Sequence, residues 1–253
     1  GHDAFTTGTI ANDTCDRFVD TMHGFKALVR AYDPITFKAC ATSAMRQAKN
    51  GMKLVGRVKN ETGIDLNIIS GKEEARIIIA THIDRHLKPQ QHCLYVDVGG
   101  GSTELTLIND KKALASKSFP IGSVRLLEKQ VTKADWAGME EWIVNKTANI
   151  NNIQSIGSGG NINKILTLLL KTKGNSVTIG EIESTIRKIE PYSIHDRIVK
   201  LNLRPDRADV IVYAGKIYSV CMQWSGAREM IVPQVGLPDG IVSQLYSDYK
   251  LKN

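Results

Sequence analysis

The stretch YVDVGGGSTELTLI, residues 95–108, sets three consecutive glycines between two apolar runs. Short apolar runs bounded by glycine predict two strands joined by a tight turn. Glycines also let the backbone approach an oxyanion closely, with successive N–H groups pointing at it. Because a simple hairpin needs only one or two glycines, the three here favour a phosphate-binding turn over an incidental glycine-rich hairpin.

Acidic and hydroxyl side chains surround this turn. Asp97 lies where the first strand ends, which is the usual place for a ligand-facing acid in an α/β sheet. Side chains alternate along the returning strand, so Ser102 and Glu104 are expected on the same face. A divalent cation between acid and phosphate explains this arrangement, and we expect Mg²⁺, bound through waters, near Asp97 and Glu104. The expected phosphate ligands of this turn are Gly99, Gly100, Gly101, Ser102 and Thr103.

A second glycine-rich stretch, GSGGN at 157–161, follows an apolar run and precedes a helical pattern. Backbone donors at a helix N-terminus suit phosphate, which makes Gly157, Gly159 and Gly160 candidate ligands. A tight strand-to-helix connection explains the same glycines about equally well. Both interpretations stay open on the sequence alone.

Two adjacent acids, Glu73 and Glu74, begin an apolar helix predicted over 71–86. At about 100° per residue, Glu74 falls between Ile77 and Ile78, whereas Glu73 falls nearer Ala80 and Asp84. Glu74 is therefore the acid expected to face a poorly hydrated cleft, where partial burial would raise its pKa and make it a better general base. The alternative is that both acids are exposed and stabilise the helix dipole.

Arg46, in the stretch ATSAMRQA at 41–48, closely follows a predicted strand. An arginine in this place can bind phosphate oxygens through its two-pronged guanidinium. An exposed helical arginine would explain the same position. We retain Arg46 as a candidate phosphate ligand.

Composition excludes several classes of protein. The 253 residues include four cysteines that form no Cys-x-x-Cys pair, so neither a zinc site nor a disulfide framework is expected, and a reducing cytoplasm fits. No apolar stretch is long enough to span a bilayer, and the first residues do not form a signal-peptide pattern. His82 and His86 have helical spacing but lack the glutamate of a zinc helix, and they are expected on the surface.

The net charge of +7 favours anionic partners or, more simply, a solubilising surface. Nucleic acid is not the expected partner, because only 6% of the residues are aromatic and no aromatic-plus-basic recognition motif occurs.

Strands alternate with helices along the chain, which predicts the α/β class. Short strands are predicted over 35–41 and 64–70. Capping boxes predict helix starts at Thr132 and Thr178, and the polar, proline-bearing stretch 86–91 is the expected linker.

Six motifs occur in one order along nearly the whole chain: ATSAMRQAKNG, IISGKEEARI, YVDVGGGSTELTLI, FPIGSVRL, SIGSGGNINKI and RADVIVYAG. This set resembles the exopolyphosphatase / guanosine pentaphosphate phosphohydrolase family of the actin-like ATPase and sugar-kinase superfamily. The resemblance implies two α/β domains of ribonuclease H-like fold with the active site in the cleft between them. We expect a first domain over 1–80 and a second over 81–239, with the final helix, 240–253, on the first domain.

The resemblance also implies an activity: Mg²⁺-dependent release of terminal phosphate from polyphosphate or guanosine pentaphosphate, in the cytoplasm and in the stringent response, by a possible homodimer. Glu74 matches the family's water-activating base, and Arg46 matches an arginine of its cleft motif. Two sets of residues match the first and second glycine loops respectively: Asp97, Gly99, Gly100, Ser102 and Glu104, and Gly157, Gly159 and Gly160.

The chain departs from the family pattern at both ends. Family members begin with a strand and a phosphate loop resembling DLGSNS, and nothing of this kind precedes Gly1. Either the sequence is trimmed or part of the phosphate cradle is missing, and a non-catalytic polyphosphate- or alarmone-binding protein is the alternative function. A kinase or ATPase of the superfamily is a further alternative. Long members carry extra helical domains beyond this point, so we expect a short, two-domain member.

Overall fold

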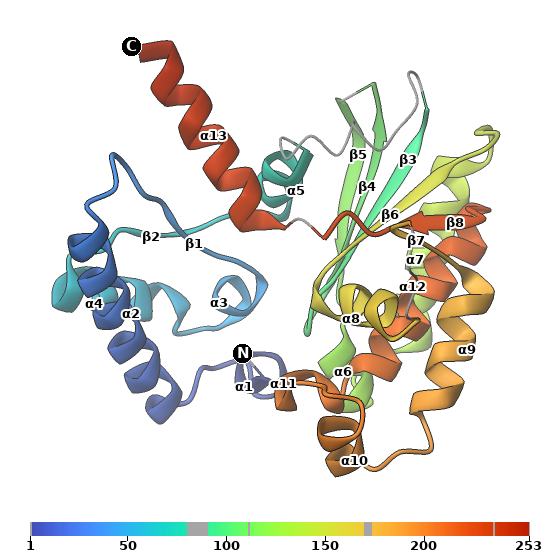
Figure 1. Cartoon of the computed structure of the whole chain (residues 1–253), viewed down its shortest axis with the longest axis horizontal. Helices are drawn as coiled ribbons and strands as arrows, with labels where there is room; N and C mark the ends of the chain where they lie inside the picture. The colour runs from blue at the N-terminus through green and yellow to red at the C-terminus, as the bar shows by residue number, and fades with distance from the viewer. Residues whose placement is uncertain (1, 80–90, 111, 170–173, 235, 253) are drawn as a thin grey trace.

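The computed structural model describes residues 2–79, 91–110, 112–169, 174–234 and 236–252. Two lobes lie side by side, and the last helix returns from the second lobe to the first (Figure 1). The N-terminal lobe contains helices of varied length and a small sheet, in the order α1 (His2–Thr6), α2 (Asn12–Tyr32), β1 (Ala39–Ala41), α3 (Ser43–Gln47), α4 (Gly51–Thr62), β2 (Leu66–Ile68) and α5 (Gly71–Ile79).

The core of the N-terminal lobe forms between α2 and α4. Val19 and Met22 of α2 are buried, and Leu54 and Val58 of α4 belong to the same apolar cluster. These residues lie three or four positions apart, so each helix turns one apolar stripe toward the other. Gly63, with φ of 77°, ends α4 in a left-handed conformation that glycine adopts without steric cost.

The C-terminal lobe is built on a six-stranded sheet in the order β5-β4-β3-β6-β8-β7. β3 pairs antiparallel with β4 and parallel with β6, so the predicted hairpin around the glycine turn is present. The strands are β3 (Cys93–Val98), β4 (Thr103–Asn109), β5 (Lys112–Phe119), β6 (Gln154–Ser158), β7 (Ser176–Thr178) and β8 (Glu229–Ile231).

Helices cover this sheet, and α12 is the most deeply buried of those described, with Ile217, Tyr218 and Cys221 fully inside the core. The predicted capping boxes at Thr132 and Thr178 are both formed and begin α7 and α9. The helices of this lobe are α6 (Ser123–Leu127), α7 (Lys133–Thr147), α8 (Gly160–Leu168), α9 (Ile179–Ile189), α10 (Ile194–Val199), α11 (Pro205–Ala208) and α12 (Ile211–Ser225).

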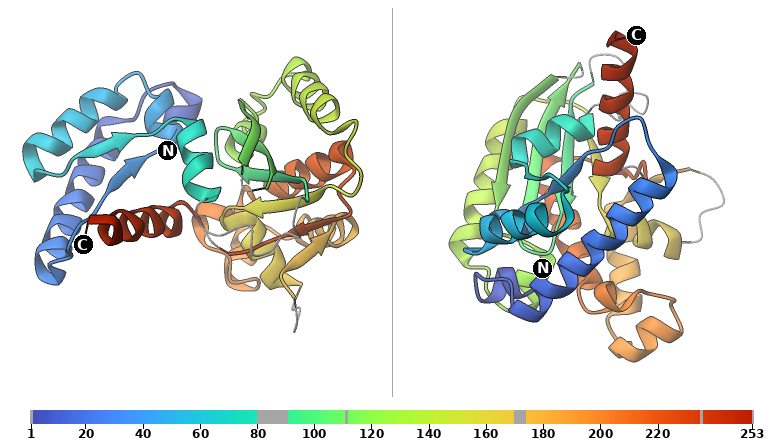
Figure 2. Two further views of the ribbon diagram at one scale, coloured as in Figure 1. Left: turned by 90° about the horizontal axis from the view of Figure 1, so that it is seen from above. Right: turned by 90° about the vertical axis from the view of Figure 1, so that its left-hand side faces the viewer.

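The final helix, α13 (Leu237–Lys252), lies against α5 of the N-terminal lobe (Figures 1 and 2). Ile241 contacts Ile69 and Ile77 in a small apolar cluster. Gly240 permits the close approach, because a Cβ at this position would lie 2.2 Å from the carbonyl oxygen of Ile77. The chain thus ends on the helix that carries Glu73 and Glu74.

The α/β class expected from the sequence is confirmed, but several boundaries differ. The strands predicted over 35–41 and 64–70 shrink to β1 and β2, which form a two-stranded parallel sheet. Only the first part of the helix predicted over 71–86 is described, as α5. His82, His86 and all of the expected linker except Gln91 lie outside the described residues. None of the helices that the structure describes combines the length and apolar character needed to cross a bilayer.

Candidate active site

The hairpin of β3 and β4 brings two acids together beside the first glycine turn. Asp97 and Glu104 are directly paired across the two strands, so their side chains share one face of the sheet. Glu104 Oε1 accepts hydrogen bonds from Ser102 Oγ at 2.7 Å and from Ser118 Oγ at 3.0 Å. The expectation that Ser102 and Glu104 face the same way is therefore confirmed. Ser118 comes from β5 and was not anticipated.

Helix α5 adds a third acid from the N-terminal lobe. The side chain of Glu74 is 13% exposed, and its Oε2 lies 3.8 Å from Nη1 of Arg46. Nη2 of Arg46 lies 3.6 Å from Oε1 of Glu104, and Nη1 donates a hydrogen bond of 2.6 Å to the carbonyl oxygen of Ile69. Arg46 therefore stands between an acid of each lobe, and both ion-pair separations exceed ordinary hydrogen-bond length.

Charge and burial raise the pKa values of two of these acids. Burial, followed by the charges of Asp97 and Glu104, raises the pKa of Glu74 to about 7, although Arg46 opposes the shift. Burial, followed by the charge of Glu104, raises the pKa of Asp97 to about 7. Glu74 Oε2 is also buried without a hydrogen-bond partner among the described residues. The cluster thus holds more negative charge than its one guanidinium balances.

Glu73 has the opposite environment, although it is the neighbour of Glu74 in sequence. Its carboxylate accepts two hydrogen bonds from Arg76, at 2.8 and 2.9 Å, on the outer side of α5. This contact lowers the pKa of Glu73. Glu74, and not Glu73, therefore faces the cluster, as its position on the helix predicted. Its pKa is raised, as expected from its burial.

The first glycine turn is held more tightly by the protein than the sequence indicated. The N–H of Gly99 donates to the carbonyl oxygen of Ser102 at 2.9 Å, so this amide is not available to a phosphate. A Cβ at Gly101 would lie 2.1 Å from the ring of Phe5, and one at Gly100 would lie 3.2 Å from it. Phe5 of α1 was missed because nothing near it in the sequence points to the turn. Glycine is thus required here for packing between the lobes.

Thr103 does not fit its predicted role as a phosphate ligand. Its side chain is fully buried, and Oγ1 donates a 2.6 Å hydrogen bond to the carbonyl oxygen of Ile121. Ser102 is likewise buried, with its hydroxyl proton directed at Glu104. Both hydroxyls support the hairpin and its acid.

The three glycines of the second turn have different structural roles: Gly157 makes room for a neighbouring side chain, whereas Gly159 and Gly160 form the turn itself. Gly157 lies inside β6, where a Cβ would meet Sδ of Met230 at 2.4 Å, so packing accounts for its lack of a side chain, and its phosphate contact stays a prediction. Gly159 has φ of 111°, and Gly160 is the first residue of α8. Nη1 of Arg207 donates to the carbonyl oxygen of Gly160 at 3.0 Å. Arg207 was not among the predicted site residues, although it begins the RADVIVYAG motif.

A model of the Ppx/GppA phosphatase family matches residues 2–248. The chain belongs to the Ppx/GppA phosphatase family. It is 29% identical over 121 residues to Exopolyphosphatase 1 of Mycobacterium tuberculosis, a match that covers 48% of this chain and 35% of that protein. It is 32% identical over 134 residues to a bifunctional 3-dehydroquinate synthase/phosphatase of Fusobacterium nucleatum, covering 51% of this chain and 20% of that protein. The chain therefore spans about a third or less of the length of the curated relatives it matches.

Solved structures of the family share the fold. An exopolyphosphatase from Cytophaga hutchinsonii superposes with a TM-score of 0.80 at 22% identity, over 96% of this chain and 85% of that one. A Ppx/GppA family member from Aquifex aeolicus superposes with a TM-score of 0.74 at 24% identity, over 98% and 86%. The two-lobed α/β architecture expected from the family resemblance is thereby confirmed.

The negative charge of the acid cluster suits a divalent cation, but its carboxylates do not form a complete set of metal ligands. Among the described residues, no group of three or more His, Cys, Asp and Glu side chains is arranged to hold a metal ion. Mg²⁺, however, keeps several waters and needs only one or two carboxylates besides substrate phosphates. Oε2 of Glu74 has no hydrogen-bond partner among the described residues, and burial, followed by the charge of Glu104, raises the pKa of Asp97, so a cation here would meet acids that the protein does not fully neutralise. Asp97 and Glu104 are therefore compatible with the expected Mg²⁺.

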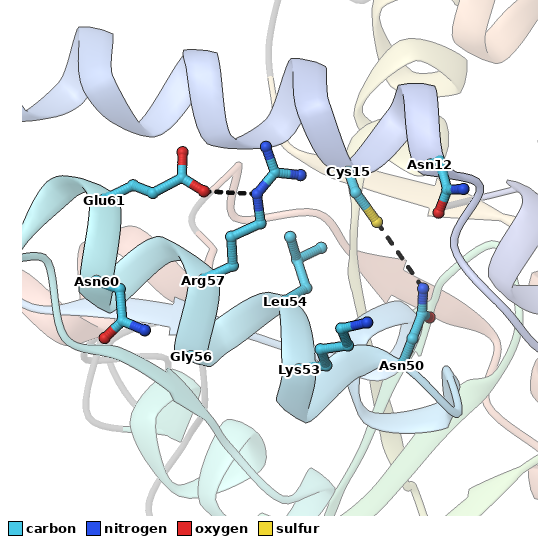
Figure 3. A pocket seen from close by; sticks show the side chains of 9 residues that line it. All are labelled: Asn12, Cys15, Asn50, Lys53, Leu54, Gly56, Arg57, Asn60 and Glu61. Carbon is cyan, nitrogen blue, oxygen red and sulfur yellow. Dashed lines mark hydrogen bonds and ion pairs between the residues drawn. The ribbon is translucent and has the colours of Figure 1, made fainter.

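A separate cavity of about 640 Å³ lies between α2 and α4 of the N-terminal lobe (Figure 3). Arg57, which lines it, is paired with Glu61 at 2.6 Å and with Asp16 at 2.5 Å. None of the acids, glycines or arginines of the candidate active site lines this cavity. The candidate chemistry therefore lies elsewhere, between α3, α5 and the β3–β4 hairpin.

Proposed function

We propose that this chain is a phosphohydrolase that releases the terminal phosphate of inorganic polyphosphate or guanosine pentaphosphate by attack of water. The observation that carries the proposal is Glu74, a largely buried acid with a pKa of about 7 and an oxygen that no described group hydrogen-bonds. Such a carboxylate can bind a water molecule and accept its proton near neutral pH. Membership of the family and the likeness to exopolyphosphatases support the substrate class.

In the proposed reaction, Glu74 accepts a proton from a water molecule whose oxygen attacks the terminal phosphorus. A new P–O bond forms to that oxygen as the bridging P–O bond breaks, and the departing oxygen leaves with the shortened substrate. Arg46, 3.8 Å from Glu74, is placed to bind the oxygens of the transferred phosphoryl group as charge accumulates on them. Gly100 and Gly101 line the adjacent turn.

Asp97 and Glu104 would hold Mg²⁺, mainly through waters, with Ser102 and Ser118 fixing the orientation of Glu104. When bound, the ion supplies neutralisation of the phosphate charge. At the second turn, Arg207 is placed to attract a polyanion beside Gly159 and Gly160. The four cysteines are free thiols, which supports a reducing cytoplasm as the location.

The test compares two neighbouring acids in one assay. Phosphate release is measured with Mg²⁺ from long polyphosphate and from guanosine pentaphosphate, for the wild type, Glu74→Gln and Glu73→Gln. Loss of a general base lowers kcat by about 100-fold or more, and we expect this loss for Glu74→Gln with substrate binding retained. Glu73→Gln, on the outer face of the same helix turn, should retain activity within about twofold, as exposed changes usually do.

Each outcome decides a different point. An unchanged rate in Glu74→Gln would exclude Glu74 as the base. Tight binding of polyphosphate by a wild type that releases no phosphate would favour the non-catalytic alternative. Turnover of ATP without polyphosphate would indicate a kinase or ATPase instead. Among active outcomes, the better substrate identifies the branch of the family.

A further inference from the structure

Tyr218 is a fully buried tyrosine on α12, beneath the ends of the two central strands. Helix α12 packs directly on β3, and the ring of Tyr218 belongs to the main apolar cluster of the lobe. A buried tyrosine hydroxyl normally finds a hydrogen-bond partner, because burying it unpaired is costly. The partner that this hydroxyl finds therefore indicates what the residue does.

The Tyr218 hydroxyl donates to the carbonyl oxygen of Ser158. Burial raises the pKa of Tyr218, and a backbone hydrogen bond with Val98 opposes that shift. Ser158 is the last residue of β6 and Val98 is the last residue of β3, and these two strands are parallel neighbours. The two residues that the hydroxyl contacts therefore each immediately precede one of the glycine turns, at the point where the chain leaves the sheet.

Gly159 shows how closely this region is packed. Its φ of 111° and ψ of 158° lie in a region that is essentially restricted to glycine. A Cβ on Gly159 would lie 3.1 Å from Oη of Tyr218, 3.4 Å from Oδ1 of Asp97 and 3.5 Å from the carbonyl oxygen of Val98. The tyrosine hydroxyl, the acid and both strand ends thus surround one backbone position.

We propose that Tyr218 is a positioning residue that fixes the two glycine turns relative to each other and to Asp97. It touches neither substrate nor metal, and it acts through the carbonyl of Ser158 and the backbone of Val98. The kinetic part of this inference rests on the proposed phosphohydrolase function. The structural part does not, since it concerns only the backbone of the two turns.

The first experiment uses Tyr218→Phe, which keeps the buried ring and removes only the hydroxyl. Tyr213→Phe is the matched control, because Tyr213 lies on the same helix, is partly exposed, and has Lys216 over its ring at 6.0 Å. Hydrogen exchange is measured over residues 96–103 and 156–163. Loss of a net hydrogen bond should speed exchange in both segments about five- to tenfold. The control should match the wild type.

The second readout is phosphate release from polyphosphate. We expect Tyr218→Phe to lower kcat about tenfold with KM within about twofold, because small misplacement of reacting groups costs rate more than binding. Unchanged exchange in both turns would overturn the proposal. So would faster exchange spread evenly over the lobe with kcat unaltered, which marks a merely structural hydroxyl. If the wild type itself releases no phosphate, the proposed function fails and the exchange data still decide the role of Tyr218.

Discussion

The two glycine turns start from neighbouring strand ends, yet groups of opposite charge border them. Glu74, Asp97 and Glu104 gather at the first turn, whereas Arg207 lies against Gly160 of the second turn, which Asp97 approaches only at Gly159. The proposed reaction needs both environments, since acids serve a cation and a water while a guanidinium attracts the polyanion. In both turns, glycine allows another group to approach the backbone closely. The charged side chains nearby then indicate which ligand each turn could bind.

The largest effect is expected from the acids of the first turn. In metal-free protein, the pKa values of Glu74 and Asp97 are about 7, above the ordinary values near 4 that unfolded chains have. The native state therefore binds more protons, and the stability due to these groups is fully present below about pH 4 and is lost as the pH rises through 7. At Glu74 the loss should approach about 3 kcal/mol.

This expectation is measured by urea unfolding in EDTA at pH 5.0 and 7.5. Glu74→Gln should reduce the pH dependence of the free energy of unfolding by the contribution of Glu74, while Asp97 still titrates. Glu73→Gln should not flatten it, because the pKa of Glu73 is lowered and its contribution lies at more acidic pH. A wild type that becomes more stable between these two pH values would contradict the charge excess at the first turn.

A smaller effect is expected from the cation at the second turn. Arg207→Met removes the guanidinium beside Gly160, and KM for polyphosphate should rise about tenfold with kcat changed less, as for loss of a charged contact to substrate. Arg204→Met is the control, since Arg204 is exposed and pairs with Asp206 at 3.0 Å. Initial rates over a range of chain lengths measure both constants. An equal fall of kcat and kcat/KM would place Arg207 in the chemical step instead.

The smallest effect tests a hydroxyl of the first turn. Thr103→Val removes the hydrogen bond to the carbonyl of Ile121 and keeps the shape of the side chain. The free energy of unfolding should fall by about 1 kcal/mol, while kcat/KM stays within about twofold. Denaturation and phosphate release, measured on the same preparation, check both statements. If the variant kept the wild-type free energy of unfolding but lost phosphate release, Thr103 would be a phosphate ligand as first predicted.

The spacing of residues along the chain was sufficient to predict those features of the site that lie within one helix or one strand. Helical periodicity predicted that Glu74, and not Glu73, faces the site. The alternation of side chains along a strand predicted that Ser102 and Glu104 share one face. Both inferences depend only on spacing along the chain, which helices and strands fix regardless of the rest of the fold.

Contacts between remote segments could not be predicted in this way. Phe5, Ser118 and Arg207 reach the site from other elements, and no local pattern links them to the glycines. The same limit applies to Gly157, whose missing side chain makes room for Met230, some seventy residues later, a reason that the sequence did not show. A glycine required by a distant neighbour looks the same in sequence as one required by a ligand.

The attachment of α13 to α5 makes the end of the chain a natural place to observe motion. Ile241 packs on Ile77, one helical turn from Glu74, so α13 and the acid belong to the same lobe although α13 follows the other lobe in sequence. Leu251 near the tip of α13 and Ile194 on α10 are both exposed. A pair of fluorophores at these two positions would therefore report any rotation of one lobe against the other as a change in energy transfer.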